Sequence, residues 1–184
     1  MIYEPRGDSY LLQEEVVKHV KNKSFLDMGA GSGILSISAI KAGAKSVLAV
    51  DIQKDVVISL KSKKIQVIQS DLFSNIKKEN KFDLITFNPP YLPEDKREDI
   101  ESQRATTGGK TGDEIILKFL KQVLKHLNKN GKILIVISSL TPQKRIELLL
   151  RKLKLKKKFL SSEKFFFEKL EVWEITKNVT QQFI

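Results

Sequence analysis

Cysteine is absent from this chain of 184 residues, which therefore has no disulfide framework and no zinc site built from thiolates. Histidine is scarce: His19 and His126 both fall in helical patterns, where we expect them at the surface or in packing, and we predict no metal site. No apolar run approaches the roughly 18 residues that cross a membrane, and the N-terminus lacks the apolar segment of a signal peptide. These absences predict a cytoplasmic protein, and the length predicts one domain over residues 1–184.

Acidic residues are fewer than basic ones, with 22 Asp and Glu against 33 Lys and Arg, so the formal net charge is +11. Such an excess favours polyanionic neighbours, such as RNA, DNA or a ribosome-associated factor, without identifying one. The run from Lys152 to Lys158 alternates with leucine before it clusters. We interpret it as a solvated helix end and strand edge in preference to a nucleic-acid patch.

The segment Asn88-Pro89-Pro90-Tyr91 follows the apolar run 82–87 and suits the binding of a planar NH2 group. The carboxamide oxygen of Asn88 and the carbonyl oxygen of Pro89 can each accept one N–H of the target. Prolines fix φ and disfavour helix, so Pro89 and Pro90 keep the carbonyls directed into a site, and Tyr91 offers a flat face. We predict Asn88, Pro89 and Tyr91 as catalytic and all four residues as substrate-binding. Taken alone, an ordinary strand-to-loop exit is the alternative.

A glycine-rich turn follows the apolar strand 25–28, with Asp27 just before Gly29-x-Gly31-x-Gly33. Glycines let a ligand approach the backbone, and the following helix N-terminus offers free N–H groups. A nicotinamide-binding turn is the rival, but it has the spacing Gly-x-Gly-x-x-Gly. A carboxylate at Asp27 would repel a pyrophosphate and suit an amino-acid ammonium. The turn therefore predicts S-adenosylmethionine, bound by Asp27, Gly29, Gly31 and Gly33.

Acids also end the next two expected strands. Asp51 ends the strand 47–50, where its carboxylate can accept hydrogen bonds from ribose hydroxyls. Asp71, beside Leu72, follows the strand 65–68 and can accept from an adenine amino group. Singly, such acids are more often loop residues or helix caps, but ligands of open α/β sheets bind beyond the carboxyl ends of strands, where all of these fall. We predict Asp51, Asp71 and Leu72 as cofactor-binding residues, together with Asn88.

These motifs resemble those of class I S-adenosylmethionine-dependent methyltransferases of the HemK type. The opening 3–12, Tyr-Glu-Pro-Arg-Gly-Asp-Ser-Tyr-Leu-Leu, is similar to the Tyr-Glu-Pro-x-Glu-Asp-Thr/Ser-x-Leu-Leu start of the archaeal and eukaryotic Mtq-type branch. Gly108-Gly109-x-x-Gly112 resembles the Gly-Gly-x-x-Gly of that branch. The resemblance spans nearly the whole chain and implies that Ser9 makes a closing contact with the cofactor.

Two departures from that branch concern the expected substrate rim. Gly7 replaces an acid, and Thr106-Thr107 stands where the branch has an aromatic residue before its glycines. The loop 91–111 carries a run of charged residues at 94–99. We expect it to be either a mobile substrate rim or a plain solvated loop.

The resemblance also implies an activity. Members of the branch methylate the glutamine side-chain amide in the Gly-Gly-Gln loop of class I translation release factors, and they often work with a small zinc-binding activator subunit. It therefore predicts protein-glutamine N5-methylation, a release factor as substrate and such a subunit as an optional partner, with no membrane involved. The alternative is methylation of an exocyclic amino group of RNA or DNA, adenine N6 or guanine N2, because the same geometry suits a flipped base.

Alternating apolar strands and amphipathic helices predict an α/β protein with a mostly parallel sheet and helices on both faces. The resemblance implies a seven-stranded Rossmann-like methyltransferase sheet with a short N-terminal helix and an antiparallel C-terminal strand. Helices are expected at about 8–21, 32–42, 53–62 and 112–127, and strands at about 24–28, 46–50, 65–69, 82–87 and 132–137, before a hairpin over 156–176.

Local signals predict where elements begin and end. Asp8 or Ser9 can cap the first helix, and Thr141-Pro142 can cap a late one. Asn130-Gly131 predicts a turn between the helix 112–127 and the strand that follows it.

Overall fold

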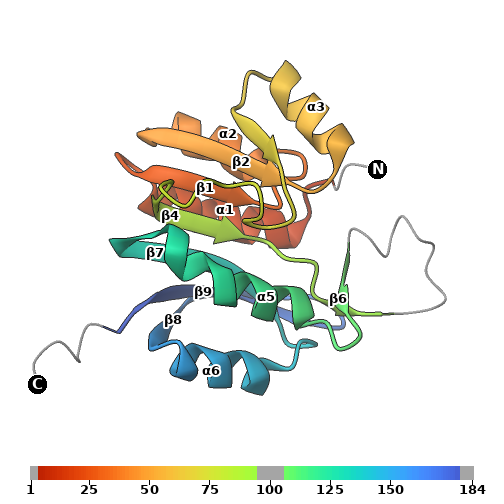
Figure 1. Cartoon of the computed structure of the whole chain (residues 1–184). Coiled ribbons are helices and arrows are strands. Elements are labelled where there is room, and N and C mark those ends of the chain that lie inside the picture. The colour runs from red at the N-terminus through yellow and green to blue at the C-terminus, as the bar shows by residue number, and fades with distance from the viewer. Residues whose placement is uncertain (1–3, 95–105, 179–184) are drawn as a thin grey trace, which may run out of the picture.

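The computed structural model describes residues 4–94 and 106–178 as one sheet with helices packed on it (Figure 1). The helices are α1 (Gly7–His19), α2 (Ile34–Lys41), α3 (Lys54–Ser62), α5 (Glu114–Val123) and α6 (Gln143–Lys152), with a 3-10 turn η1 (Leu124–His126). The strands of the sheet are β1 (Ser24–Met28), β2 (Ser46–Asp51), β3 (Val67–Gln69), β4 (Phe82–Phe87), β7 (Leu127–Ser138), β8 (Leu155–Lys164) and β9 (Lys169–Lys177). A separate pair consists of β5 (Leu92–Pro93) and β6 (Thr107–Gly109).

The sheet has seven strands in the order β3-β2-β1-β4-β7-β9-β8. The first five of these are parallel to one another, and β9 is antiparallel to both β7 and β8. The predicted fold class, a mostly parallel seven-stranded sheet with an antiparallel C-terminal strand, is confirmed. Because the strands are parallel, the carboxyl ends of β1, β2 and β4 meet at one edge of the sheet.

Both faces of the sheet are buried at its inner strands, and each face carries its own helices. On one face α5 and α6 pack on a core that includes Ile85, Ile135 and Trp173. On the other face α1 and α2 pack against Leu84 and Val136, with α3 beside β2. Successive side chains of a strand point to opposite faces, so a strand covered on both sides must be apolar throughout. This explains why the segment 82–87 reads as a nearly continuous apolar run.

The predicted turn at Asn130-Gly131 is wrong, because both residues lie inside β7. The helix before it ends at Val123, and η1 leads the chain into the strand at Leu127. A Cβ at Gly131 would lie 2.9 Å from the carbonyl oxygen of Phe82, so glycine allows β7 to pass close to β4 at an irregularity in their register. Asn130-Gly131 predicts a turn by its residue types, but in the structure its glycine marks a place where two strands approach closely.

The predicted helix caps are also wrong. The N-cap of α1 is Arg6 and that of α6 is Pro142, and neither makes a side-chain capping bond. The Asp8 carboxylate instead accepts hydrogen bonds from Ser9 and from the side chain of Asn88. Both neighbours of that carboxylate belong to the site described below, so tertiary contacts took precedence over local capping.

Further predictions concern the histidines, membrane-spanning segments, metal ligands and the charged run after Tyr91. His126 packs flat on Phe73 with ring centroids 4.8 Å apart, as expected of a packing residue. No helix within residues 4–94 and 106–178 is long and apolar enough to span a bilayer. In the same described residues, no group of three or more potential His, Asp or Glu ligands is placed to hold a metal ion. The charged residues at 95–99 lie outside the described part of the chain.

Candidate active site

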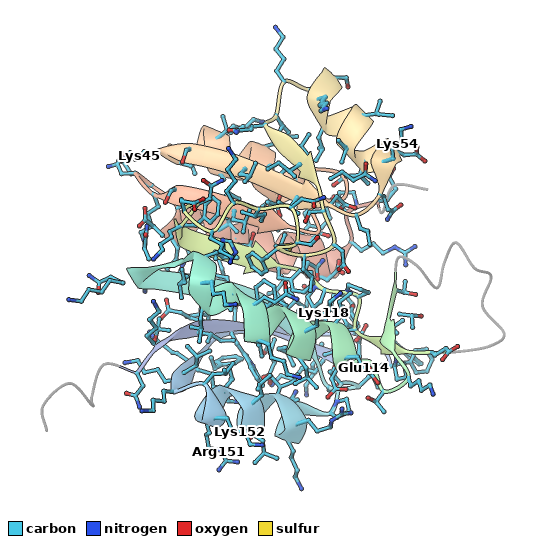
Figure 2. The ribbon with its side chains drawn as sticks, in the orientation of Figure 1. Lys45, Lys54, Glu114, Lys118, Arg151 and Lys152 are labelled. Atoms are coloured by element: carbon cyan, nitrogen blue, oxygen red, sulfur yellow. The ribbon has the colours of Figure 1, made fainter. Side chains whose placement is uncertain are left out.

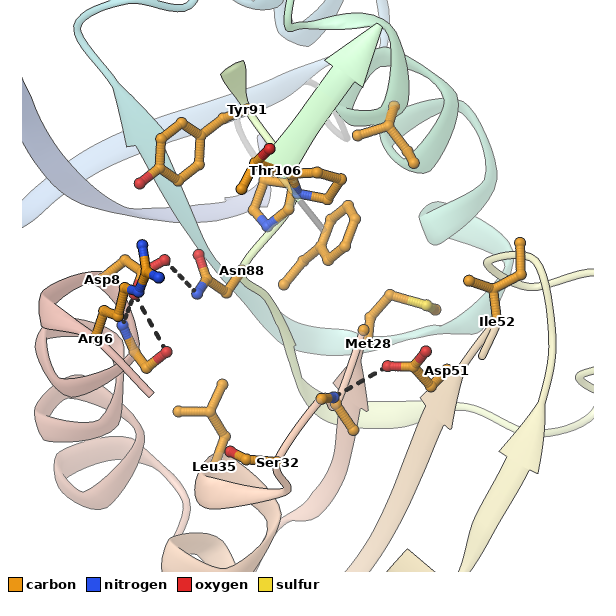
Figure 3. Close-up of a pocket in the computed structure, with 18 of the residues that line it drawn as sticks. Arg6, Asp8, Met28, Ser32, Leu35, Asp51, Ile52, Asn88, Tyr91 and Thr106 are labelled. Atoms are coloured by element: carbon orange, nitrogen blue, oxygen red, sulfur yellow. Dashed lines mark hydrogen bonds between the residues drawn. The ribbon is translucent and has the colours of Figure 1, made fainter. Parts of the chain in front are cut away.

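A cavity of about 420 Å³ opens where the carboxyl ends of β1, β2 and β4 meet (Figure 3). Its wall brings together segments that are far apart in the sequence: residues 6–9 before and in α1, the glycine turn 28–32, residues 50–53 and 70–72 after β2 and β3, residues 87–92, and residues 165, 168 and 170 at the tip of the β8–β9 hairpin. A volume of this size is typical of small-molecule sites. The predicted location of the site at the strand ends is where the structure has its cavity.

The glycine turn adopts a backbone that favours glycine at three positions. Gly29, Gly31 and Gly33 have φ of 66°, 51° and 82°, in the left-handed region. Gly29 and Gly31 line the cavity, whereas Gly33 does not. A Cβ at Gly33 would lie 2.5 Å from a methyl group of Leu60, so this glycine serves close packing of α2 on α3.

The structure corrects the predicted direct contact of Asp27 with the cofactor. Asp27 is completely buried beneath the turn and is not part of the cavity wall. Its Oδ2 accepts hydrogen bonds from the backbone N–H and the hydroxyl of Ser36, at 3.0 and 2.6 Å, and so fixes the first turn of α2. Burial raises the pKa of the Asp27 carboxyl to about 7, against the opposing effect of the Ser36 hydrogen bonds. Asp27 therefore braces the turn from below.

Asp51 lines the cavity at the end of β2 while it also braces the turn. Its Oδ2 accepts from the Gly31 N–H at 3.0 Å, drawn as a dashed line in Figure 3, and its Oδ1 accepts from the Gln53 N–H at 2.9 Å. A carboxylate has about four lone-pair positions, so two remain for a ligand. Burial raises the pKa of Asp51, and the backbone hydrogen bonds oppose that shift.

Asp71 and Leu72 also line the cavity, beyond β3. Asp71 Oδ2 is paired with Lys118 Nζ of α5 at 2.6 Å, and both side chains are about half exposed. Figure 2 shows Lys118 on the helix that covers this face of the sheet. Leu72 has a φ of 50°, which is uncommon for a side chain other than glycine and points to a functional constraint on this backbone.

Asn88 presents a carbonyl oxygen that has no partner among the described residues. Its Nδ2 donates to Asp8 Oδ2 at 3.1 Å, and because a carboxylate only accepts, this contact fixes which way the carboxamide faces. Within the described structure, Asn88 Oδ1 is buried and makes no hydrogen bond. A buried acceptor without a donor costs free energy, which a ligand N–H would recover. Figure 3 shows Asn88 between the α1 side of the cavity and Tyr91.

The rest of the Asn-Pro-Pro-Tyr segment lines the same cavity, and two glycines hold it in place. A Cβ at Gly108 would lie 2.5 Å from the carbonyl oxygen of Pro90, and one at Gly112 would lie 2.5 Å from that of Tyr91. No other residue allows the two backbones to approach so closely. The Gly-Gly-x-x-Gly segment thus packs directly on the backbone that carries Asn88.

Tyr91 is further positioned by the β8–β9 hairpin. Its hydroxyl lies 3.5 Å from Oε1 of Glu168, and Oε2 of the same carboxylate accepts from the Ser138 hydroxyl at 2.5 Å. Ser9 lines the cavity at α1, where its hydroxyl donates to Asp8. The structure therefore places all predicted site residues at the cavity except Asp27 and Gly33.

Several lining residues have no counterpart in the sequence analysis. Among them are Arg6, Ile52, Phe165 and Glu168, and the sequence predicts Asp8 only as a cap. The hairpin residues come from the far end of the chain, so spacing could not connect them to the site. One available signal is the run of three phenylalanines at 165–167, because a hairpin turn is normally polar.

Solved structures share this fold. The E. cuniculi Mtq2–Trm112 complex, described as responsible for methylation of the eRF1 translation termination factor, matches with a TM-score of 0.78 at 22% identity, over 96% of this chain and 98% of that one. The T. thermophilus 16S rRNA N2 G1207 methyltransferase, in complex with AdoMet and guanosine, matches with 0.68 at 20% identity, over 95% of this chain and 44% of that one. At such identities the likeness establishes the fold alone.

Relatives in sequence are more similar. A protein of Methanocaldococcus jannaschii, provisionally named a protein N5-glutamine methyltransferase, is 40% identical over 179 residues, which cover 93% of this chain and 89% of the relative. The release factor glutamine methyltransferase of Rhodopirellula baltica is 30% identical over 157 residues, 73% of this chain and 53% of that one. The chain thus spans nearly all of the archaeal relative and about half of the bacterial one.

The methyltransferase small domain family matches residues 7–167, which include the glycine turn, the Asn-Pro-Pro-Tyr segment and most of the cavity wall. The resemblance seen in the motifs is confirmed by this match and by the relatives. From its sequence and its site, this chain belongs to the methyltransferase small domain family.

Proposed function

We propose that this methyltransferase transfers a methyl group from S-adenosylmethionine to the side-chain amide nitrogen of a protein glutamine, in the Gly-Gly-Gln loop of a class I translation release factor. The observation that carries the proposal is the Oδ1 of Asn88, which is buried, has no hydrogen-bond partner within residues 4–94 and 106–178, and has its direction fixed by Asp8. A target NH2 group supplies the donor that this oxygen lacks. The M. jannaschii relative, 40% identical, is named for the same reaction.

The chemistry of the cavity wall fits the proposed cofactor. Asp51 retains lone pairs for the ribose hydroxyls, and the turn at Gly29 and Gly31 leaves backbone open to the methionine part. Leu72 and the exposed side chain of Ile52 offer apolar surface to a flat adenine ring. Asp71 would accept from the adenine amino group and Ser9 would close the site from α1. When bound, S-adenosylmethionine supplies an electrophilic methyl group on its sulfonium.

The acceptor side must overcome the weak nucleophilicity of an amide nitrogen, whose lone pair is delocalised into the carbonyl. Asn88 Oδ1 would accept one N–H and the Pro89 carbonyl the other, which holds the nitrogen still and shifts electron density onto it in the transition state. Tyr91 would pack its ring against the planar amide. The proton leaves after the transfer, when the nitrogen has become acidic, so the reaction needs no general base.

A second candidate is methylation of an exocyclic amino group in RNA or DNA. It is favoured by the net charge of +11 and by the fold shared with the T. thermophilus rRNA enzyme. Among the described residues that line the cavity, however, Arg6 is the only basic one, and Figure 2 shows Lys45 and Lys54 at the opposite end of the molecule from Arg151 and Lys152. We therefore rank a protein substrate first and a nucleic acid second.

We also propose a partner and a cellular compartment for this activity. The structural neighbour Mtq2 is described in complex with Trm112, so a small zinc-binding activator subunit is a candidate partner for this chain. Because the substrate is a translation factor, the proposed compartment is the cytoplasm. Co-expression with a candidate activator, followed by size-exclusion chromatography, tests for a heterodimer.

The test of the proposed function offers two acceptors side by side to the enzyme and isotopically labelled S-adenosylmethionine. One acceptor is a class I release factor from the same organism, and the other is total tRNA with rRNA. We expect label on the release factor, and none on a release factor whose loop glutamine is changed to alanine. Label on RNA with the protein untouched would support the second candidate. If neither is labelled, the assay is repeated with the activator present, and a second blank result contradicts both.

A further inference from the structure

The tip of the β8–β9 hairpin carries two aromatic rings that are almost fully exposed. Phe166 is 93% exposed and Phe167 is 84% exposed. Their rings meet edge to face, with centroids 4.7 Å apart. Each ring gains little burial in the free chain, and adjacent exposed apolar side chains commonly mark a surface that a partner covers.

This tip is anchored to the rest of the sheet and is continuous with the cavity. The Phe165 N–H donates to the Glu168 carbonyl at 2.8 Å and closes the turn, while the Glu168 carboxylate accepts from Ser138 at the end of β7. Phe165 and Glu168 line the cavity. The four-residue tip therefore directs two side chains into the cavity wall, and the two side chains between them lie in solvent.

Gly7 explains how Phe165 can lie against α1. A Cβ at residue 7 would collide with the Phe165 ring. The acid found at this position in the Mtq-type branch could not be accommodated with the ring in place. Where the Mtq-type branch has an acid, this chain has Gly7 with the Phe165 ring against it. The rim of the cavity is therefore apolar at this point instead of charged.

The charges around the tip favour a protein partner. Residues 163–171 contain two lysines, Lys164 and Lys169, and three glutamates, Glu163, Glu168 and Glu171, so their net charge is −1 in a chain of +11. Lys169 is moreover paired with Glu171 at 2.8 Å. Surfaces that stack nucleic-acid bases combine aromatic rings with cations that are free to meet phosphates. The hairpin tip has two exposed aromatic rings, but its residues 163–171 carry no excess of cations.

We propose that Phe166 and Phe167 form a docking surface for the protein that carries the target glutamine. The two rings pack on apolar side chains near that glutamine while Asn88 holds its amide in the cavity. This inference rests on the proposed function and adds to it how the enzyme selects a protein acceptor. The contacts of the two rings with the substrate protein stabilise the bound substrate and the transition state equally. They therefore lower KM and leave kcat unchanged.

The test uses the full chain with both rings truncated, Phe166→Ala with Phe167→Ala, and a class I release factor as the probe. We expect KM for the release factor to rise by about tenfold or more, because exposed aromatic anchors dominate many interfaces. We expect kcat and the affinity for S-adenosylmethionine to stay within about twofold, since neither ring lines the cavity. Phe159→Ala, which removes a half-exposed ring in the middle of β8, serves as the matched control and should leave KM unchanged.

The outcomes separate this inference from the proposed function. Wild-type transfer to the release factor with an unchanged KM in the double variant overturns the docking surface and leaves the function intact. Direct binding of the release factor, measured by calorimetry with S-adenosylhomocysteine present, gives a second readout: equal affinities of wild type and double variant overturn the inference. A double variant that loses affinity for RNA instead would assign the tip to nucleic acid and overturn it as well.

Discussion

The two halves of the cavity differ in how far the protein completes them by itself. In the half formed by the glycine turn and β2, both oxygens of Asp51 already accept backbone hydrogen bonds, and the turn is held from below by Asp27. In the half formed by the Asn-Pro-Pro-Tyr segment and the hairpin tip, no described residue donates to Asn88 Oδ1, and two phenylalanine rings lie in solvent. The comparison indicates a cofactor site that is preorganised and an acceptor site that only the substrate completes.

The largest expected effect comes from removing the unpaired acceptor. Asn88→Ala should lower kcat by about 100-fold or more, as the loss of one transition-state hydrogen bond commonly does. Because Asn88 is also a predicted cofactor residue, the affinity for S-adenosylmethionine is measured by calorimetry, and we expect it to fall far less than kcat, since Asp51 and the glycine turn are unchanged. An unchanged kcat in a folded variant that binds cofactor would show that Asn88 is not the amide acceptor.

The next effect tests whether the acceptor loop needs its glycine support. Gly108→Ala places a Cβ against the Pro90 carbonyl and should cost about 2 kcal/mol of stability, a fall in Tm of about 4–8 °C, together with a clear loss of kcat. Gly43→Ala is the control, since Gly43 has a φ of 82° but its Cβ would meet only ordinary contact with Lys21. Thermal unfolding and kinetics should show that the control lowers Tm alone. Equal losses of kcat in both variants would contradict the positioning role of Gly108.

A smaller effect tests whether kcat depends on the orientation of the Asn88 amide as well as on its presence. Asp8→Ala frees the carboxamide to rotate and should lower kcat by about tenfold, the usual worth of one hydrogen bond to a charged group. In the background of Asn88→Ala the same change should cost almost nothing, because the group it positions is gone. The measurement is a double-mutant cycle on kcat, with Tm recorded for all four proteins. Additive losses would mean that Asp8 acts through the fold of α1.

The smallest effect concerns Asp27. It is the exception to the preorganisation of the cofactor half, because its Oδ1 is buried without a hydrogen-bond partner in the described structure. Its carboxyl has a pKa of about 7 in the folded chain and an ordinary value near 4 when unfolded, so the folded state holds the proton more tightly. Stability from this group is therefore greatest below about pH 4 and is lost as the pH rises towards 7. Asp27→Asn, which stays neutral, should gain in Tm relative to wild type by a few degrees, about 1 kcal/mol, between pH 5 and 6. Parallel Tm profiles would refute the raised pKa.

Much of the fold could be predicted from sequence because the inner strands of the parallel half, β1 and β4, are buried on both faces. The segment 82–87 could be little else than an internal strand, and the alternation of such runs with helices implied parallel pairing. The predictions that failed were local ones. Asn130-Gly131 reads as a turn, yet β4 passes so close to Gly131 that the ladder continues through it. Local propensities are weak beside such packing.

The candidate site divides in the same way. Residues of one motif, such as Asn88-Pro89-Pro90-Tyr91, could be predicted because their chemistry is contiguous in the chain, and the structure places all four at the cavity. Asp8 and Asn88 are 80 residues apart, so their hydrogen bond had no signature in spacing. The hairpin tip is farther still, and the replacement of an acid by Gly7 made sense only once Phe165 was seen against it.

By itself the sequence determined the fold class, the family and the chemistry on offer, since these depend on the residue types, their periodicity and the order of motifs along the chain. Only the tertiary structure decided which of those groups remain free to act. Asp27 is enclosed under the turn, outside the cavity wall, and holds Ser36, whereas Asn88 lies in the cavity wall with the direction of its amide fixed by Asp8. The reason is physical: a side chain's hydrogen bonds and burial are set by neighbours that folding brings from distant parts of the chain.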